Sequence, residues 1–389
     1  MNNKKPVSTG KKVALGISGG VDSATCAHML LEQGYDVTGV YLECWRAPGC
    51  RSEVDRKDAL KVALDLGIPF KVLDFKKAYK DTVVEYFFTE YEAGRTPNPD
   101  VMCNKEIKFG LFYDWAMQEK FDFVATGHYA KISEIKNDTG VLVKQLAIPK
   151  DAHKDQTYFL HLLKEDQVNH TLFPLQNLTK PEVRKKAVSY GLHISDKKDS
   201  VGICFIGDIN VHEFLKERLG ENHGEVVDTA GNVIGSHQGL WFYTVGQRSG
   251  FQINAKTIIK QDDGTTIDKH NIPPFYVIRK NQEKNQLVVG FGAETLVDSF
   301  LVTMPHWIHT QNKEIALKYQ ELFVRIRHTG ELFTCTLKQK DEGSFVVQLA
   351  QATKGIAQGQ SAVFYTKLKS SGTTETICLG GGVITIENL

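Results

Sequence analysis

Two glycines flanked by hydroxyl side chains stand between a strand-like run and a helix-like run near the start of the chain, in the stretch SGGVDS from Ser18 to Ser23. Glycines let backbone N–H groups approach an anion, and a helix N-terminus favours negative charge, so the stretch predicts a phosphate-binding loop. It is not a Walker A loop, because Val21 and Asp22 stand where that motif has its lysine and hydroxyl residue. Asp22 would suit a magnesium ion bound together with the phosphates. From these residues alone, a plain Gly-Gly turn followed by a helix cap is the alternative.

Two of the seven cysteines stand in motifs unlike the other five. Cys103 lies in TPNPDVMCN, a segment stiffened by two prolines just ahead of a predicted helix, whose N-terminus favours a thiolate. Cys204 lies in SVGICFIG. The residues alone leave each cysteine as either a nucleophile or a small core side chain. Asp100, in the first of these motifs, is either a general acid or base or a turn-forming residue after proline.

A structural zinc site is not expected, because Cys44 and Cys50 lack a second ligand pair at zinc spacing and the 13 histidines are scattered. The odd number and irregular spacing of the cysteines also argue against a secreted disulfide framework. The polar start MNNKKPVSTGKK and the lack of any run of about 18 apolar residues predict neither a signal peptide nor a membrane span. We therefore expect a cytoplasmic protein.

Strand-like and helix-like stretches alternate from Lys12 to about Ala130, which predicts a parallel sheet covered by helices. SGGVDS, the predicted loop GRTPNPDVMCN and the segment GHYA all fall at the loops that follow strands or at helix starts. Ligands of such sheets gather at the carboxyl ends of the strands. These segments should therefore lie together.

Beyond about Asn210, short alternating runs such as LWFYTVG, PFYVIR and SAVFY predict strands, and hence a small linking domain and a barrel. The polar tract KTIIKQDDGTTIDKHN reads as an exposed insertion. The predicted organisation is an α/β catalytic domain over residues 1–210, a small central domain over 211–280 and a C-terminal β-barrel over 281–389.

A length of 389 residues fits two or three domains, and the formal net charge of +1 means that a nucleic acid would be held by local basic patches. Each such patch is either an RNA contact or a solvated helix face. The candidate patches are Lys76, Lys77 and Lys80, and Lys180, Arg184, Lys185 and Lys186.

The phosphate loop resembles that of the ATP-pyrophosphatase family, which cleaves ATP between the α and β phosphates, and this resemblance implies adenylation of an acceptor. The wider set of motifs is similar to that of MnmA/TrmU-type tRNA-specific 2-thiouridylases, in order and approximate spacing. These motifs are SGGVDS, TPNPDVMCNKEIKF, TGHYAKI, KDQTYFL, SVGICFIG, WFYTVGQR, IAQGQSAVFY and CLGGGV.

The resemblance implies roles for particular residues. Cys103 matches the nucleophile, Cys204 matches the cysteine that carries the persulfide, and the two would form a transient disulfide. The implied ATP site comprises Gly16, Ile17, Ser18, Gly19, Gly20, Val21, Asp22, Ser23, Leu42 and Gly127. The implied contacts to the target base and to tRNA are Asn98, Pro99, Asp100, His128, Lys154, Asp155, Gln156, Arg327, His328 and Gln360. At Arg327 and His328 the family more often has an Arg-Tyr pair.

The implied reaction is 2-thiolation of the wobble uridine of tRNA. A uridine 2-carbonyl oxygen leaves poorly, so ATP with Mg²⁺ would first adenylate it, and persulfide sulfur would then displace AMP. A wobble uridine in a single-stranded loop can be turned into a protein pocket. The resemblance implies tRNAs for glutamate, glutamine and lysine as substrates, and a cysteine desulfurase or sulfur-relay protein as the sulfur donor.

Two other functions fit parts of the sequence. An amide or lysidine synthetase would also adenylate its substrate, but it would need neither Cys103 nor Cys204. A non-catalytic RNA-binding or sulfur-carrier protein would bind tRNA without consuming ATP. The intact SGGVDS loop together with both motif cysteines favours the thiolase.

Overall fold

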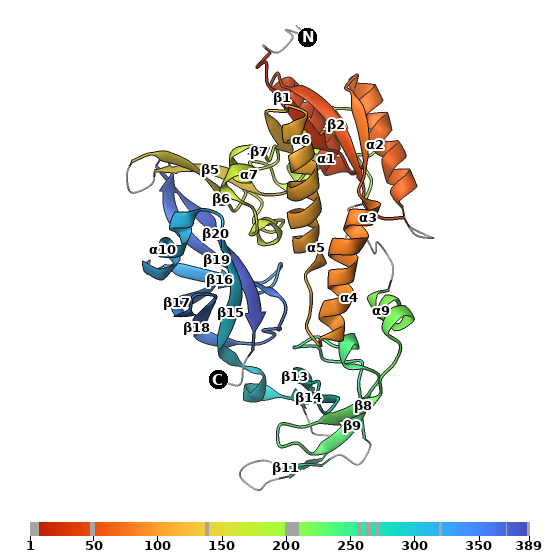
Figure 1. The fold of residues 1–389 in the computed structure, drawn as a ribbon, viewed down its shortest axis with the longest axis vertical. Helices are drawn as coiled ribbons and strands as arrows, with labels where there is room; N and C mark the ends of the chain where they lie inside the picture. Colours follow the sequence, from red (N-terminus) through yellow and green to blue (C-terminus); the bar gives the residue numbers. More distant parts are fainter. Residues whose placement is uncertain are drawn as a thin grey trace.

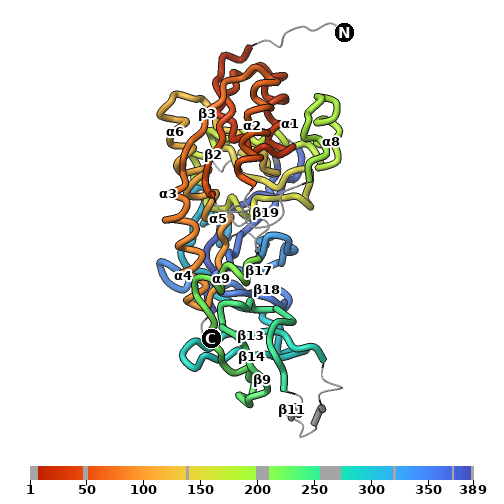
Figure 2. The backbone as a smooth tube through the Cα atoms, turned by 90° about the vertical axis from the view of Figure 1, so that its right-hand side faces the viewer, coloured from red at the N-terminus to blue at the C-terminus, as the bar shows by residue number. Residues whose placement is uncertain are grey.

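The computed structural model describes residues 8–46, 51–136, 140–198, 210–254, 258–260, 266–268, 273–318, 321–370 and 372–386. Figure 1 shows an α/β unit near the N-terminus, a small β unit at the opposite end and a β-barrel beside them. The side view in Figure 2 shows that the molecule is elongated, with the N-terminal unit and the small β unit at its two ends. Cys204 and most of the polar tract around residue 263 lie outside the described residues.

The α/β unit is built on a five-stranded parallel sheet in the order β3-β2-β1-β4-β7. Its strands are β1 (Lys12–Gly16), β2 (Asp36–Glu43), β3 (Phe70–Asp74), β4 (Phe123–Ala125) and β7 (Thr171–Leu172). The central strand β1 is covered on both faces, since Val13 and Leu15 pack in one apolar cluster and Ala14 packs in another. The predicted α/β fold with a parallel sheet is confirmed.

Helices cover both faces of this sheet. Helices α1 and α8 contribute side chains to the apolar cluster that contains Val13 and Leu15. Helix α6 contributes side chains to the cluster on the opposite face, which contains Ala14. The helices of this layer system are α1 (Val21–Glu32), α2 (Ser52–Leu66), α6 (Phe112–Gln118), α7 (Glu165–Asn169) and α8 (Lys180–Ser189).

Two helical runs extend from the sheet toward the small β unit (Figure 1). One consists of α3 (Lys76–Tyr79), a π-helical segment over Lys80–Val84 and α4 (Glu85–Glu92). The other consists of α5 (Pro99–Met102), a π-helical segment over Cys103–Leu111 and then α6. The prediction of a loop through residue 104 is therefore wrong in its second half, because Pro99 begins a helix, as proline readily does at a first helical position.

The small β unit is a sheet in the order β10-β9-β8-β14-β13, preceded by α9 (Val211–Leu219). Its strands are β8 (Gly224–Val227), β9 (Val233–His237), β10 (Gln252–Ile253), β13 (Tyr276–Asn281) and β14 (Gln286–Gly290). The predicted boundary after residue 280 falls inside β13, which pairs with β14 in this sheet. A separate two-stranded sheet joins β11 (Ile258–Lys260) and β12 (Thr266–Asp268).

The run LWFYTVG, predicted as a strand, instead forms a short 3₁₀ helix over Leu240–Phe242. Its rings leave the sheet and pack on helices, since Trp241 and Phe242 join the apolar cluster of α4 and α9. The Phe242 ring stacks on His212 with ring centroids 4.1 Å apart. Tertiary contact with the helices thus overrides the alternating pattern.

The barrel closes because β15 pairs with both β18 and β20 in the order β15-β18-β17-β16-β19-β20. Its elements are β15 (Val297–Trp307), α10 (Thr310–Lys318), β16 (Leu322–Arg325), β17 (Phe333–Asp341), β18 (Ser344–Thr353), β19 (Ser361–Ser370) and β20 (Thr373–Thr385). A hairpin from the N-terminal part of the chain, β5 (Lys131–Lys136) and β6 (Leu142–Ala147), extends this sheet from β20. The predicted barrel is confirmed.

A buried ion pair joins the α/β unit to the barrel. Arg325 at the end of β16 donates to the carboxylate of Asp155 at 2.5 Å, and both side chains are buried. The same carboxylate accepts from the backbone N–H and the hydroxyl of Thr157, and that hydroxyl lies 3.1 Å from the Tyr365 hydroxyl of β19. The two units therefore share one connected polar network inside an apolar interface.

None of the helices in the described part of the chain is long and apolar enough to span a bilayer.

Breaking the Arg325–Asp155 pair should destabilise the joint between the two units. We expect Asp155→Asn to lower the free energy of unfolding by about 3 kcal/mol, because it leaves a buried guanidinium without a charged partner. The double variant Asp155→Leu with Arg325→Met should recover part of that loss, since it removes both charges. Urea unfolding measures the free energy of unfolding of each variant. Lys61→Ala, which removes an exposed pair with Asp65 on α2, is the control and should change stability by less than about 0.5 kcal/mol. An Asp155→Asn variant as stable as this control would contradict the prediction.

Candidate nucleotide and tRNA site

The predicted phosphate loop connects the carboxyl end of β1 to the N-terminus of α1. Hydroxyl groups brace it from inside: the Ser23 hydroxyl accepts from the backbone N–H of Ser18 at 3.1 Å, and it lies 3.2 Å from the Ser18 hydroxyl. The first turn of a helix leaves its N–H groups without intrahelical acceptors, and here that turn starts at Val21. This arrangement fits an anion such as the phosphates of ATP.

Two positions of this region require glycine, because another part of the backbone lies very close to each of them. Gly19 has a φ of +73°, and a Cβ there would lie 2.1 Å from the backbone oxygen of Asp55 on α2. A Cβ on Gly127, which follows β4, would lie 3.0 Å from the backbone nitrogen of Ser23. Gly127 therefore lets the backbone after β4 lie close against the first turn of α1.

The remaining residues of the predicted ATP site lie at the same edge of the sheet. Gly16 ends β1 and Ile17 follows it, Leu42 lies near the end of the neighbouring β2, and Gly127 follows β4 on the other side. The carboxyl ends of parallel strands meet there. The structure thus brings together residues that are up to 111 positions apart, from Gly16 to Gly127.

Asp22, the predicted magnesium-binding residue, lies in the first turn of α1. Both of its oxygens accept from the ammonium of Lys180 at 2.8 Å, and one also accepts from the Tyr129 hydroxyl at 3.0 Å. A carboxylate is an oxygen ligand of the kind that Mg²⁺ prefers. In the described residues, no group of three or more His, Cys, Asp or Glu side chains gathers to hold a metal without help from a ligand.

Lys180, one of the candidates for a basic patch, does not lie on an open basic surface. It is buried against the phosphate loop and not on the outer face of α8. Arg184, one turn later, donates to the backbone oxygens of Ser195 and Lys197. In the other predicted patch, Lys76 and Lys77 pair with carboxylates, at Glu43 and Asp74 and at Asp81.

Cys103 begins the π-helical segment between α5 and α6. It is 3 % exposed and lies in an apolar cluster with Tyr79 and Phe87, against which Cys44 and Trp45 from the end of β2 also pack. Long π-helical segments are rare and often occur at functional sites. The predicted nucleophile is therefore at the same edge of the sheet as the phosphate loop, but it is covered.

The loop before Cys103 is held by the barrel. The Gln360 amide donates to the backbone oxygens of Thr96 and Pro97 at 3.1 and 2.9 Å, and the Thr96 N–H donates to the Gln358 oxygen at 2.8 Å. Gly359 is required here, because a Cβ would lie 2.8 Å from the Cβ of Arg95. The barrel thus fixes the backbone from which the predicted base-binding residues project.

Those base-binding residues form the turn that starts α5. Asn98 caps the helix by accepting from the Val101 N–H at 3.3 Å, and its side chain also contacts the Tyr158 hydroxyl. Pro99 is buried, whereas Asp100 is partly exposed. Asp100 is therefore the most exposed of the three residues in this turn.

The three residues of the segment predicted to face tRNA, 154–156, have three different environments. Lys154 is exposed. Asp155 is the buried partner of Arg325 described above. The Gln156 side chain accepts from the Tyr129 N–H at 2.9 Å, which ties this segment to the GHYA segment. Lys154 is the most exposed residue of this segment.

Two histidines of the predicted site are kept neutral. Burial lowers the pKa of His128 well below its usual range, and the nearby Lys108 ammonium lowers that pKa further. Burial also lowers the pKa of His328, against the opposing effect of the carboxylates of Asp155 and Asp100. The His328 ring packs on Phe159 at a centroid distance of 4.1 Å, while Arg327 beside it is exposed. Because Asp100 acts on its pKa, His328 lies near the start of α5.

Two residues that the sequence reasoning did not single out belong to this region, together with Lys180, which it singled out only as part of a basic patch. Lys180 and Lys197 contact the phosphate loop, and Tyr158 supports Asn98 from the barrel side. Tyr158 lies within the motif KDQTYFL, so that motif could have pointed to it. The two lysines lie 158 and 178 residues beyond the loop residues that they contact, and only the fold brings them to it.

Three family models match the chain. Residues 11–208 match one described as a tRNA methyl transferase HUP domain, residues 212–291 match a tRNA methyl transferase PRC-barrel domain, and residues 297–384 match an aminomethyltransferase beta-barrel domain.

Known proteins resemble the chain over nearly its whole length. It is 38 % identical over 392 residues to the tRNA-specific 2-thiouridylase MnmA of Shewanella sp. (strain MR-4), covering 99 % of this chain and 98 % of that protein. It is 40 % identical to the protein of the same name from Lacticaseibacillus paracasei, covering 96 % and 94 %. Among solved structures, the U34-tRNA thiolase NcsA from Methanococcus maripaludis covers 52 % of this chain and 64 % of its own, at 22 % identity and a TM-score of 0.34, which is too distant to inform function.

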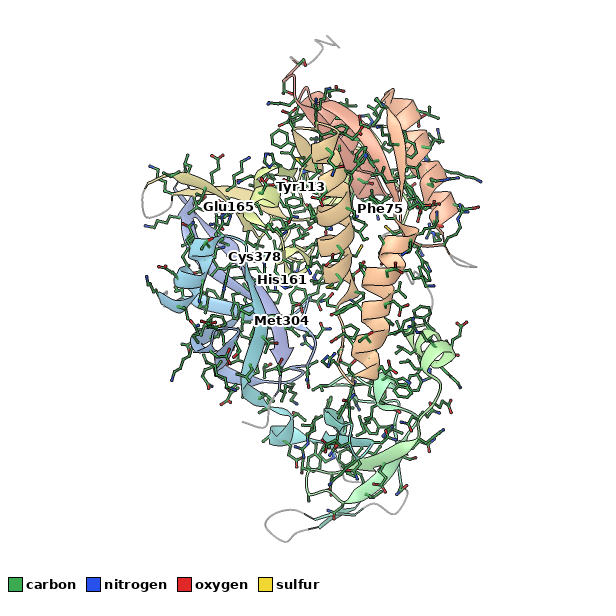
Figure 3. The ribbon with its side chains drawn as sticks, viewed as in Figure 1. Phe75, Tyr113, His161, Glu165, Met304 and Cys378 are labelled. Carbon is green, nitrogen blue, oxygen red and sulfur yellow. The ribbon has the colours of Figure 1, made fainter. Side chains whose placement is uncertain are left out.

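His161 behind the site should make stability depend on pH. Figure 3 labels its side chain, which is buried. Its Nδ1 lies 2.8 Å from the backbone oxygen of Tyr158, and burial lowers its pKa to about 4. The unfolded chain binds a proton near pH 6.5 that the folded chain does not bind, so stability is full above that pH and falls as the pH drops toward 4. On going from pH 7 to pH 5, His161 should lower the free energy of unfolding by about 2 kcal/mol.

Urea unfolding of wild type and His161→Asn at both pH values measures this cost. The stability deficit of the variant should shrink by about 2 kcal/mol on going from pH 7 to pH 5. His223→Asn, at an exposed position, should follow wild type. A deficit of the His161 variant that does not change with pH would contradict the shifted pKa.

Proposed function

Because this chain belongs to the tRNA-specific 2-thiouridylase family, we propose that it is a tRNA sulfurtransferase that uses ATP to thiolate a uridine of its tRNA substrate. The observation that carries the proposal is the identity of 38–40 % over almost the whole of this chain and of its relatives. The α/β unit with its phosphate loop supports nucleotide binding.

The first step we propose is adenylation of the 2-carbonyl oxygen of the wobble uridine. The uridine oxygen attacks the α-phosphate of ATP, and pyrophosphate leaves. The N–H groups at the start of α1 and the hydroxyls of Ser18 and Ser23 suit the phosphates, and Leu42 and Gly127 border the nucleotide. Magnesium would supply positive charge on the departing pyrophosphate, with Asp22 as the residue to hold it.

The second step is transfer of sulfur to C2 of the base. In one route, the Cys103 thiolate attacks the inner sulfur of a persulfide on Cys204, which forms a Cys103–Cys204 disulfide and releases hydrosulfide. Hydrosulfide then attacks C2 and expels AMP. In the other route, the terminal persulfide sulfur attacks C2 and expels AMP, and Cys103 then attacks the Cys204 sulfur to release the thiolated base. Both routes end in the same disulfide, which a thiol reductant must reduce.

The base would be held at the start of α5, where Asn98, Pro99 and Asp100 form the turn before Cys103. Asp100 is the partly exposed carboxylate there, and we assign it the role of general acid or base. Lys154 and Arg327 are the exposed cations for tRNA phosphates. Asp155, Gln156 and Gln360 make contacts within the protein, so we assign them to holding these surfaces in place as well as to the tRNA interface.

His128 and His328 complete the proposed interface as neutral rings. A neutral imidazole can both donate and accept a hydrogen bond, which suits the edge of a base better than a phosphate. The substrates we propose are tRNAs for glutamate, glutamine and lysine, and the sulfur donor is a cysteine desulfurase or a relay protein.

Thiolation of a defined tRNA tests this function. An unmodified tRNA transcript is incubated with the protein, ATP, Mg²⁺ and either a labelled persulfide donor or labelled sulfide, and its nucleosides are analysed by mass spectrometry. We expect ATP-dependent 2-thiouridine. With the persulfide donor, Cys103→Ser and Cys204→Ser should each lose at least 100-fold in product, whereas free sulfide should restore thiolation by Cys204→Ser.

Cys335→Ala is the matched control, since Cys335 is a buried cysteine in the barrel core and should be dispensable. Its product yield should stay within about twofold of wild type. Conversion of ATP to AMP and pyrophosphate without any thiolated base would overturn the proposal and favour an amide or lysidine synthetase.

A further inference from the structure

One face of α4 binds the loop that leads into α5, and the two helices lie beside each other in Figure 1. Tyr86 and Glu90 project from this face, because side chains four residues apart lie on the same side of a helix. The Glu90 carboxylate accepts two hydrogen bonds from the Arg95 guanidinium, both at 2.6 Å. The Tyr86 hydroxyl accepts from the backbone N–H of Asn98 at 3.3 Å. Helix α4 therefore binds the first and the last residue of the segment 95–98.

The barrel binds the two residues between them. The Gln360 amide donates to the backbone oxygens of Thr96 and Pro97, as described above. Each of the four residues ahead of Pro99 is thus fixed by α4 or by the barrel. A loop that is already ordered presents its polar groups to a ligand without a further entropic cost on binding.

Two tyrosine hydroxyls meet at Asn98, and they differ in what their protons do. The Tyr158 hydroxyl contacts the Asn98 side chain and donates to the backbone oxygen of Ser361 at 3.0 Å. The Tyr86 hydroxyl accepts from the Asn98 N–H, and none of the described residues places an acceptor within hydrogen-bonding distance of it. A tyrosine hydroxyl has one hydrogen to donate, so that of Tyr86 is available to a ligand.

The Tyr86 hydroxyl stays protonated at neutral pH. Burial raises its pKa, which outweighs the opposing effect of the hydrogen bond from Asn98. The side chain is nevertheless partly exposed. Tyr86 therefore offers a neutral hydrogen-bond donor, fixed to the backbone at the start of α5, to a molecule that approaches from solvent.

We propose that Tyr86 is a further residue of the target-base pocket, and that its hydroxyl donates a hydrogen bond to the 4-carbonyl oxygen of the uracil. The inference rests on the proposed function, in which the base lies at the turn of Asn98, Pro99 and Asp100. In that reaction O2 of the uracil is adenylated and replaced, whereas O4 is unchanged throughout. A donor at O4 holds the base during both steps, and it favours uracil over cytosine, which has an amino group at that position.

A double-mutant cycle on tRNA affinity tests this contact. The probes are two glutamate tRNAs, with uridine or 4-thiouridine at the target position, bound in the presence of a non-hydrolysable ATP analogue. Sulfur accepts hydrogen bonds more weakly than oxygen. Tyr86→Phe should therefore weaken binding of the uridine tRNA by a factor about three- to tenfold larger than that for the 4-thiouridine tRNA, as expected for one neutral hydrogen bond.

A tyrosine that only positions the turn gives a different result. Without an acceptor for the Asn98 N–H, the turn would be disturbed whichever base is bound, so Tyr86→Phe would weaken both tRNAs by the same factor. Equal factors, or no weakening of either tRNA, would overturn the contact to O4. Because the two affinities are compared within one variant, a fraction of misfolded protein does not change their ratio.

Tyr190→Phe is the matched control, since it also removes one hydroxyl from the α/β unit, in this case one that donates to Glu32 at 2.6 Å. It should bind both tRNAs like wild type. The outcomes separate the two proposals. A wild-type protein that forms no 2-thiouridine would refute the proposed function, whereas an active wild type with equal factors for Tyr86→Phe would refute only the role of Tyr86.

Discussion

The docking of the barrel on the α/β unit is the constraint on which the rest of the candidate site depends. Its centre is the buried pair of Asp155 and Arg325, extended by Thr157 and Tyr365. Burying two charges is costly unless their geometry and remaining hydrogen bonds are satisfied, so this contact allows little freedom of position. With it fixed, the barrel segment around Gln360 meets the loop before α5 and sets the backbone ahead of Cys103.

The site is consequently assembled from three distant parts of the chain. The sheet edge supplies the phosphate loop, the helical run from α5 to α6 supplies Cys103, and the barrel supplies His328 and Gln360. The formal net charge of the chain is only +1, and many of its basic side chains are paired with carboxylates within the protein. The exposed cations Lys154 and Arg327 stand at the border between the units.

The phosphate loop could be predicted from sequence because its parts are contiguous: strand, glycines and helix follow one another within 20 residues. The parallel sheet and the barrel followed from the alternation of patterns along the chain. The start of α5 was missed, since the prolines of TPNPD suggest a loop and only the capping by Asn98 shows that Pro99 opens a helix. The pairing of Asp22 with Lys180 and that of Asp155 with Arg325 could not be predicted, because the partners lie 158 and 170 residues apart in sequence and are brought together by packing.

The β5–β6 hairpin imposes an order on the folding of the chain that the order of the domains along the sequence does not reveal. It belongs by sequence to the α/β unit, yet it pairs with β20 near the C-terminus, where Lys131 and Glu375 form an ion pair at 2.7 Å. During synthesis, that hairpin emerges more than 200 residues before the strand it joins. An N-terminal fragment would therefore carry an exposed strand edge, and such edges promote aggregation. The hairpin of the α/β unit is therefore paired only after strand β20 of the barrel has been made.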